Sequence, residues 1–203
     1  GDNLMPVTIN GDGSITGLAV GGLPDGCVDT DTLANSAVTT AKSSGLGIIE
    51  IDSWNFSASF TQPNSYGQYI TSNWQRKPSS KHFAKKGTGM TESSGVFTFP
   101  RTGLYLIRVT LSISTISGNN LDYCGPYIQI STNSGGAYDR VSESYLNMDH
   151  GTRYMSTSGE AIVSVSNVST FRCRLETESS GNFTIRASNG QSNLDFMRLG
   201  DAT

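Results

Sequence analysis

Residues that could act in acid–base or nucleophilic catalysis are few in this chain. It contains two histidines, His82 and His150, far apart in the sequence. A serine hydrolase needs a histidine that contacts a serine and is oriented by a carboxylate. Asp149 precedes His150, but neighbours on a strand point to opposite faces, so we interpret this pair as part of a polar turn. No paired carboxylates in an aromatic cleft are recognisable as a glycosidase site, although a pair formed between subunits stays open. We therefore predict no catalytic residues and no enzyme activity.

Metal-ligand patterns are also weak. The histidines and the three cysteines lack zinc-finger spacing. Asp25, Asp29 and Asp31 lie close together, but they do not follow the calcium-loop pattern. We therefore expect no metal and no cofactor. One carboxylate per chain could still form a cation site on a three-fold axis, and the sequence leaves that open.

The cysteines do not form a disulfide framework. There are three, Cys27, Cys124 and Cys173, and an odd number of unpaired thiols suits assembly in a reducing cytoplasm. Cys173 lies in an alternating apolar run and is predicted to be a core residue. The segment 124–126, Cys-Gly-Pro, is predicted to be a turn. A bridge between Cys124 and Cys173 is the alternative.

One stretch, 61–90, combines aromatic and basic side chains in a segment expected to be irregular. Five of the 14 lysines and arginines fall within residues 76–86. We interpret this run as a contact for an anionic surface or a host cell-surface glycan, and the alternative is a solvated loop. The net charge of −3 disfavours nucleic acid as the partner. The candidate contact residues are Tyr66, Tyr69, Trp74, Arg76, Lys77, Lys81, Lys85 and Lys86.

Strands are the elements expected to carry these residues. From Tyr105 to Ile113 apolar side chains alternate with polar or exposed ones, which is the pattern of a strand with one face in a core. Similar short runs recur through residues 46–203 with Gly, Asn and Ser between them, which predicts an all-β sandwich of about eight to ten strands. The other inward positions are expected at Trp54, Phe56, Ala58, Phe60, Phe97, Phe99, Ile128, Ile130, Val141, Tyr145, Ala161, Val163, Val165, Phe171, Leu175, Phe183, Ile185, Ala187, Leu194, Phe196 and Leu199. No apolar run approaches the ~20 residues of a membrane helix, and no signal peptide is recognisable, so no membrane insertion is expected.

Residues 1–45 differ from the rest of the chain. They contain no Trp, Tyr or Phe, and the first basic residue is Lys42. Two short strands are expected around the turn residues 10–13, followed by a helix that begins at Thr30 or Asp31. Its narrow apolar stripe is marginal alone and would be satisfied by two further copies, so we predict a trimeric stalk, with a disordered tail as the alternative.

The spacing from Phe97 through Pro100, Gly103 and Tyr105 to Ile107 follows an F-x-x-P-x-x-G-x-Y-x-hydrophobic pattern. It resembles the jelly-roll heads of the tumour necrosis factor and complement globular-head superfamily. The resemblance implies a jelly roll of about eight to ten strands and a homotrimer that works by presenting surfaces. The closing strand of that family usually contains Phe-Ser-Gly-Phe, and residues 195–199 depart from this.

A second resemblance covers residues 15–42. The segment GGLPDG at 21–26, followed by a Leu-Ala-x-x-Ala-Val-Thr run ending near Lys42, is similar to a segment of tail-fibre and virion proteins of bacterial viruses. It implies an attachment segment at 1–45 that contacts other virion proteins, followed by a head at 46–203. The predicted stalk and attachment contacts are Leu23, Val28, Leu33, Ala34, Ala37, Val38 and Ala41.

These features together predict a structural virion protein of a bacteriophage, assembled in the host cytoplasm. It would be a trimeric fibre, spike or capsid-decoration protein whose head is displayed for attachment to the host surface. Two alternatives stay open: a secreted, trimeric cytokine- or complement-like ligand, and a glycan-cleaving tailspike.

Overall fold

The chain divides into two units, Gly1–Leu46 and Gly47–Thr203. The computed structural model describes residues 8–9, 11, 15–16, 47–64, 66–77, 84–116, 121–149, 154–187 and 190–202. In the first unit β1 (Thr8–Ile9) pairs with β2 (Ile15–Thr16) in an antiparallel hairpin. This confirms the two short strands expected around residues 10–13. The predicted helix and the stalk contacts, from Leu23 to Ala41, lie outside the described residues.

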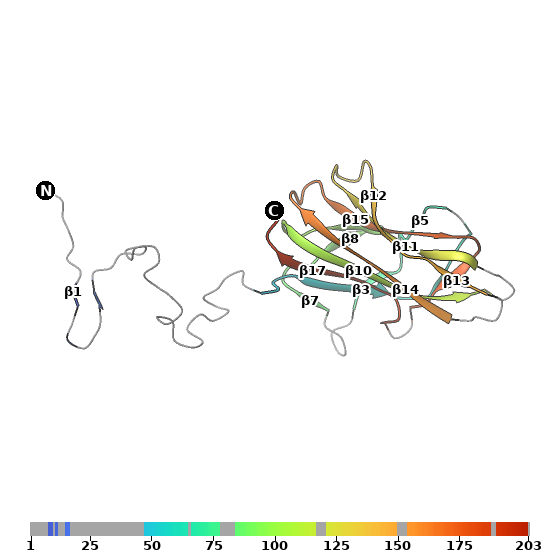
Figure 1. Cartoon of the computed structure of the whole chain (residues 1–203), viewed down its shortest axis with the longest axis horizontal. Helices are drawn as coiled ribbons and strands as arrows, with labels where there is room; N and C mark the ends of the chain where they lie inside the picture. Colours follow the sequence, from blue (N-terminus) through green and yellow to red (C-terminus); the bar gives the residue numbers. More distant parts are fainter. Residues whose placement is uncertain are drawn as a thin grey trace. The chain divides into compact units, whose positions relative to one another are not determined.

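The second unit is a sandwich of two antiparallel sheets (Figure 1). The first, called the β10 sheet here, has the order β4 (Phe60–Gln62), β16 (Phe183–Ile185), β10 (Gly103–Thr115), β17 (Asn193–Gly200), β3 (Ile51–Phe56) and β6 (Trp74–Arg76), with β14 (Tyr154–Val165) beside β10 and β7 (Lys85–Lys86) beside β3. The second, the β11 sheet, has the order β12 (Asp139–Glu143), β11 (Leu121–Ser131), β15 (Arg172–Ser179), β9 (Val96–Thr98) and β8 (Thr91–Ser93), with β13 (Leu146–Met148) beside β11 and β5 (Gln68–Tyr69) beside β15. The described residues contain no helix, and the predicted all-β sandwich is confirmed.

Strand β10 is the centre of the first sheet and behaves as its alternation predicts. Tyr105, Ile107, Val109, Leu111 and Ile113 are all buried between the two sheets. The strand begins at Gly103, whose φ is +150°. A Cβ there would lie 2.3 Å from the side chain of Arg198 and 2.6 Å from the carbonyl oxygen of Gly200. The turn that opens β10 therefore requires glycine.

Aromatic rings from four strands or their ends meet in the core. Phe97 lies edge-on to Trp54 and Trp74, with ring centroids 5.3 and 5.1 Å apart, and 5.2 Å from the ring of Phe196. Trp74 satisfies its indole N–H by donating to the carbonyl oxygen of Ile70 at 2.9 Å. Because the partners are far apart in the sequence, this cluster joins the two sheets and closes the sandwich.

The cysteine prediction is confirmed for Cys173 and wrong for the segment 124–126. Cys124 and Cys173 are both buried with free thiols, so the alternative of a bridge between them is not realised. Burial raises the pKa of both thiols, that of Cys124 to about 12. Cys124, Gly125 and Pro126 lie inside β11 and pair with β15 rather than forming a turn. Proline is tolerated because the neighbouring strand on the other side changes from β12 to β13 at this point.

Three other details differ from the sequence expectations. Ala58 is exposed, because β3 ends at Phe56 and the chain bends before β4. Leu199 is exposed and Arg198 is buried instead, since strand alternation from Leu194 continues through Phe196 to the arginine. Val141 and Tyr145 are also exposed. The segment 61–90, expected to be irregular, contributes β5, β6 and β7 to the sheets.

Tyr105 predicts a loss of stability at high pH. Its Oη donates to the carbonyl oxygen of Arg101 at 3.0 Å, and burial, with the nearby charge of Glu50, raises its pKa to about 12. The unfolded phenol titrates near pH ~10, so the folded state holds this proton more tightly. Stability from this group is complete below about pH 10 and is lost as the pH rises through about 12. We expect Tyr105→Phe to flatten the fall in the free energy of unfolding over this interval, measured by urea denaturation. Parallel curves for the two proteins would contradict this.

Candidate functional site

The predicted contact residues do not form one surface. Tyr66 and Tyr69 lie at β5, against the β11 sheet, and both are exposed. The described basic residues of the run lie instead at β6 and β7, against β3 in the other sheet. Trp74 is part of the aromatic core. Lys81 lies outside the described residues, and a receptor-contact role for the whole set stays a prediction.

Arg76 is engaged inside the protein. Its Nε and Nη2 donate to the two carboxylate oxygens of Asp52 at 2.7 and 2.9 Å, and Nη2 also donates to the carbonyl oxygen of Met90 at 2.8 Å. The guanidinium lies 4.6 Å from the ring centre of Trp54. The hydrogen bond to Asp52 raises the pKa of Arg76. Its donors are therefore committed to holding segment 84–90 on β3.

The lysines of the run are more accessible. Lys77 Nζ lies 3.6 Å from Asp195, Lys85 Nζ donates to the carbonyl oxygen of Thr88 at 3.1 Å, and Lys86 is exposed. The loop after them is anchored because Glu50 accepts from the backbone N–H groups of Thr88 and Gly89. The basic residues thus surround two buried carboxylates, and much of their charge is balanced locally.

The outer face of the β10 sheet carries an apolar row across four strands. The register places Ile162 opposite Leu106, Leu106 opposite Met197, and Met197 opposite Ile51. Ile162 is 63% exposed. A row of apolar side chains on the face opposite the core has no packing role within the described sandwich. We call this row and the charged row beside it the assembly face.

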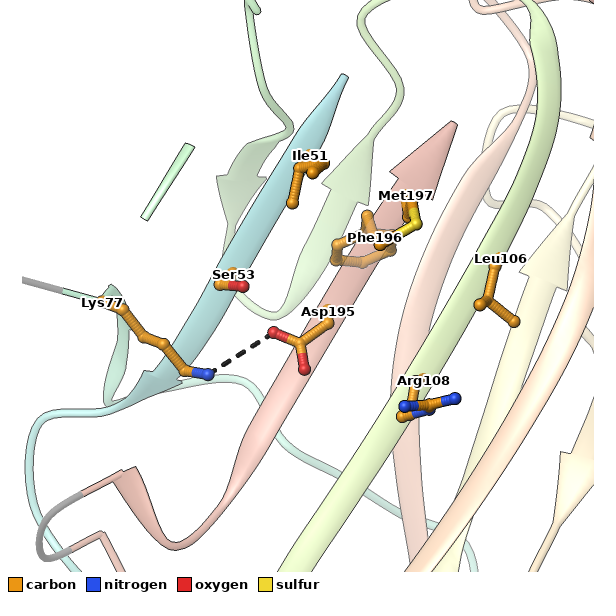
Figure 2. Close-up of a pocket in the computed structure, with 8 residues that line it drawn as sticks. All are labelled: Ile51, Ser53, Lys77, Leu106, Arg108, Asp195, Phe196 and Met197. Carbon is orange, nitrogen blue, oxygen red and sulfur yellow. Dashed lines mark ion pairs between the residues drawn. The ribbon is translucent and has the colours of Figure 1, made fainter. Parts of the chain in front are cut away.

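The charged row runs parallel to the apolar one. Arg108 Nη2 lies 3.0 Å from Glu160 on β14, and its other neighbour across the sheet is Asp195 on β17. Figure 2 shows Lys77 reaching toward Asp195 and Arg108 standing on the far side of it. Charges therefore alternate along this row. The two rows border a shallow depression of about 330 Å³.

A second constellation lies on the outer face of the β11 sheet, built from tyrosines, arginines and two glutamates. Arg140 lies over the rings of Tyr66 and Tyr127, 5.0 and 3.7 Å from their centres. Arg174 lies 3.6 Å from the ring centre of Tyr69 and 3.7 Å from that of Tyr138. We call these six residues the tyrosine–arginine surface. Sequence reasoning found Tyr66 and Tyr69 and missed the other four.

The carboxylates beneath this surface are fully engaged. Arg140 Nη2 donates to Glu176, and Arg140 Nη1 lies 3.3 Å from Glu178. Tyr127 Oη donates to Glu178 at 2.6 Å, and Gln129 Nε2 donates to Glu176. Glu176 and Glu178 stand two residues apart on the same face of β15, but both are buried and paired. A glycosidase needs one carboxyl group that can give up or take a proton, and this pairing opposes such a role.

Comparison with known proteins identifies the architecture. No protein-family model matches the sequence, and no curated protein matches it. Among solved structures, murine APRIL at pH 5.0 is similar, with a TM-score of 0.54 and 11% identity over 74% of this chain and 98% of that one. Murine APRIL at pH 8.5 has a TM-score of 0.52 and 12% identity over 73% and 99% of the two chains. Eiger TNF from S. frugiperda has a TM-score of 0.55 and 16% identity over 77% and 95%. The head is a TNF-like jelly roll. At these identities the likeness shows the fold alone.

Within the described part of this TNF-like jelly roll, metal and membrane signals are absent. No group of three or more His, Cys, Asp or Glu side chains is placed to hold a metal ion. No helix there is long and apolar enough to cross a membrane. His82 and His150 lie outside the described residues. The described surfaces are suited to contact between macromolecules, and the assembly face is the more apolar of the two.

Proposed function

We propose that the chain is a trimeric structural protein of a bacterial virus particle that displays its TNF-like jelly roll. The assembly face carries the proposal. Its apolar row, Ile162 to Ile51, lies outside the core and next to a row of alternating charges. An apolar centre bordered by charged groups is the usual composition of a protein interface.

The alternating charges explain how copies would find one register. Arg108 and Lys77 each lie beside a carboxylate within the same chain. When two such rows meet, a shifted register places like charges together, which is unfavourable. The apolar row supplies the burial, and the charged row selects the arrangement. A closed ring of three copies is the assembly implied by the family that the sequence resembles.

The viral part of the proposal rests on residues 15–42, which resemble fibre and virion proteins. The segment would attach the trimer to other virion proteins through Leu23, Val28 and the apolar stripe that ends at Ala41. The protein would be assembled in the host cytoplasm and carried in the virion. Three identical heads on one particle convert weak contacts with a host surface into a strong attachment, because the later contacts form at high effective concentration.

The assembly face is tested by a substitution in its apolar row. Leu106→Asp places a charge in the middle of the row, and we expect the variant of the full-length chain to be monomeric, because burying an unpaired carboxylate costs more than the interface gains. Light scattering measures the native mass. The matched control is Val141→Asp, an exposed position in β12 of the other sheet, which should leave the trimer intact. A monomeric parent protein, or a trimeric Leu106→Asp variant, would contradict the assembly.

A second candidate function is a secreted, trimeric signalling ligand, which the fold likeness to murine APRIL and Eiger TNF favours. It uses the same assembly face, so native mass does not separate the two functions. Density-purified virus particles from the host culture separate them. The viral function requires the chain in those particles at a constant ratio to the coat protein, whereas a secreted ligand stays in the particle-free medium.

A further inference from the structure

A continuous chain of polar side chains crosses the outer face of the β11 sheet and ends at Arg174. Arg174 Nε donates to Gln129 Oε1 at 2.6 Å, and Gln129 in turn donates to Glu176. Arg140 then joins Glu176 to Glu178. Within this chain the positive charge of Arg140 and the two carboxylates are paired. Arg174 is the end of the network, and its own charge has no described carboxylate beside it.

The guanidinium of Arg174 is held flat with most of its donors unused. Tyr69 and Tyr138 lie 3.6 and 3.7 Å from it, one ring from β5 and the other from the residue before β12. A guanidinium has five N–H groups. Toward the described residues only the Nε–H donates, to Gln129, so both terminal nitrogens keep their donors for a ligand. Two parallel N–H groups in a fixed plane are the geometry that binds a carboxylate bidentately.

We propose that Arg174, between Tyr69 and Tyr138, binds the carboxylate of an acidic saccharide. One uncompensated positive charge matches one carboxylate on an otherwise neutral ligand, and does not match a polyanion such as nucleic acid. The rings of Tyr69 and Tyr66 are 46% and 73% exposed, so they offer flat apolar faces to the carbon–hydrogen face of a sugar ring. The side chains are already ordered by stacking and hydrogen bonds, which lowers the entropy lost on binding.

The inference specifies the ligand of the display function proposed above, and it rests on that proposal for the choice of a surface glycan. It also corrects the expected place of the anion contact. The arginine of the basic run, Arg76, has its donors bound to Asp52 and Met90. Arg174 is eight or more strands further along the chain and has donors to offer.

The test measures binding of sialyllactose and of a galacturonate tetrasaccharide to the full-length protein by isothermal titration calorimetry. Lactose and a glutamate tetrapeptide are the comparison ligands. Arg174→Lys keeps the charge but removes the planar fork, and we expect it to weaken binding by about tenfold to a hundredfold. The matched control is Arg186→Lys. Arg186 also lies over a tyrosine, Tyr154, but against one ring only, and its replacement should leave the affinity unchanged.

Each outcome decides the proposal. Binding of either acidic saccharide, with lactose and the peptide inert and the loss confined to Arg174→Lys, supports it and shows which acidic sugar is preferred. Equal affinity in Arg174→Lys, no binding of either saccharide, or equal binding of the glutamate peptide overturns it. Thermal melting of each variant reports folding. Light scattering on the same samples reports assembly, so a trimer that binds no saccharide removes this inference alone, and a monomer that binds removes the assembly alone.

Discussion

Replacing Asp52 by alanine is expected to lower the free energy of unfolding of the head by about 3–5 kcal/mol. The Asp52 side chain is 2% exposed and accepts hydrogen bonds from Arg76 Nε at 2.7 Å and from the backbone N–H of Met90 at 2.6 Å. Without it, the guanidinium of Arg76 keeps its charge in a partly buried place, and a buried backbone N–H has no acceptor. Removing one partner of a buried pair leaves the desolvation cost of the other uncompensated. Urea denaturation measures the change.

The control for this variant is Asp201→Ala. Asp201 also pairs with an arginine, Arg198, but its side chain is 97% exposed, so water replaces the lost contact and little stability should be lost. Asp52→Asn is a second useful variant, because it keeps the shape and one acceptor oxygen while removing the charge. We expect its stability to lie between those of the parent and Asp52→Ala. Equal stability of all four proteins would show that the carboxylate does not hold segment 84–90 on β3.

Gly125→Ala is expected to be the most disruptive single-methyl substitution in the β11 sheet. A Cβ on Gly125 would lie 1.7 Å from the carbonyl oxygen of Ser144 and 2.8 Å from its carbonyl carbon. Both are backbone atoms of the link between β12 and β13, so no side-chain rotation relieves the clash. The link is also held there, because the Ser144 N–H donates to the carbonyl oxygen of Pro126 at 3.2 Å. We expect a loss of about 3 kcal/mol or more, since overpacking is costly when backbone must move.

Gly200→Ala is the matched control for this substitution. Gly200 also lies in a strand, at the end of β17, and a Cβ there meets nothing within 4 Å. The same methyl group should therefore leave stability nearly unchanged. Thermal melting of the two variants under identical conditions makes the comparison. A Gly125→Ala protein as stable as Gly200→Ala would mean that the β12–β13 link moves away freely, and its close approach to β11 would then have no structural importance.

Alternation along single strands predicted the main features of the core. The inward residues of β10, β11 and β15 could be read directly because a pleated strand with one buried face has a side-chain period of two. Trp54, Phe97 and Phe196 were recognised for the same reason. The prediction failed at Cys124–Pro126, because Gly-Pro is typical of turns. Only the change of neighbour from β12 to β13 shows why a strand accepts it there.

The surfaces could be predicted less well than the core. The basic run looked like one patch because its residues are close in sequence, yet the fold commits Arg76 to Asp52 and leaves the lysines near other carboxylates. Tyr69, Tyr138 and Arg174 come from three distant segments, and no local pattern relates them. The sequence by itself determined the all-β class and the inward face of each long strand, since these depend on local period and composition. The tertiary structure alone decided which side chains share a surface and which charges are already paired, because strand order and register bring together residues that are remote along the chain.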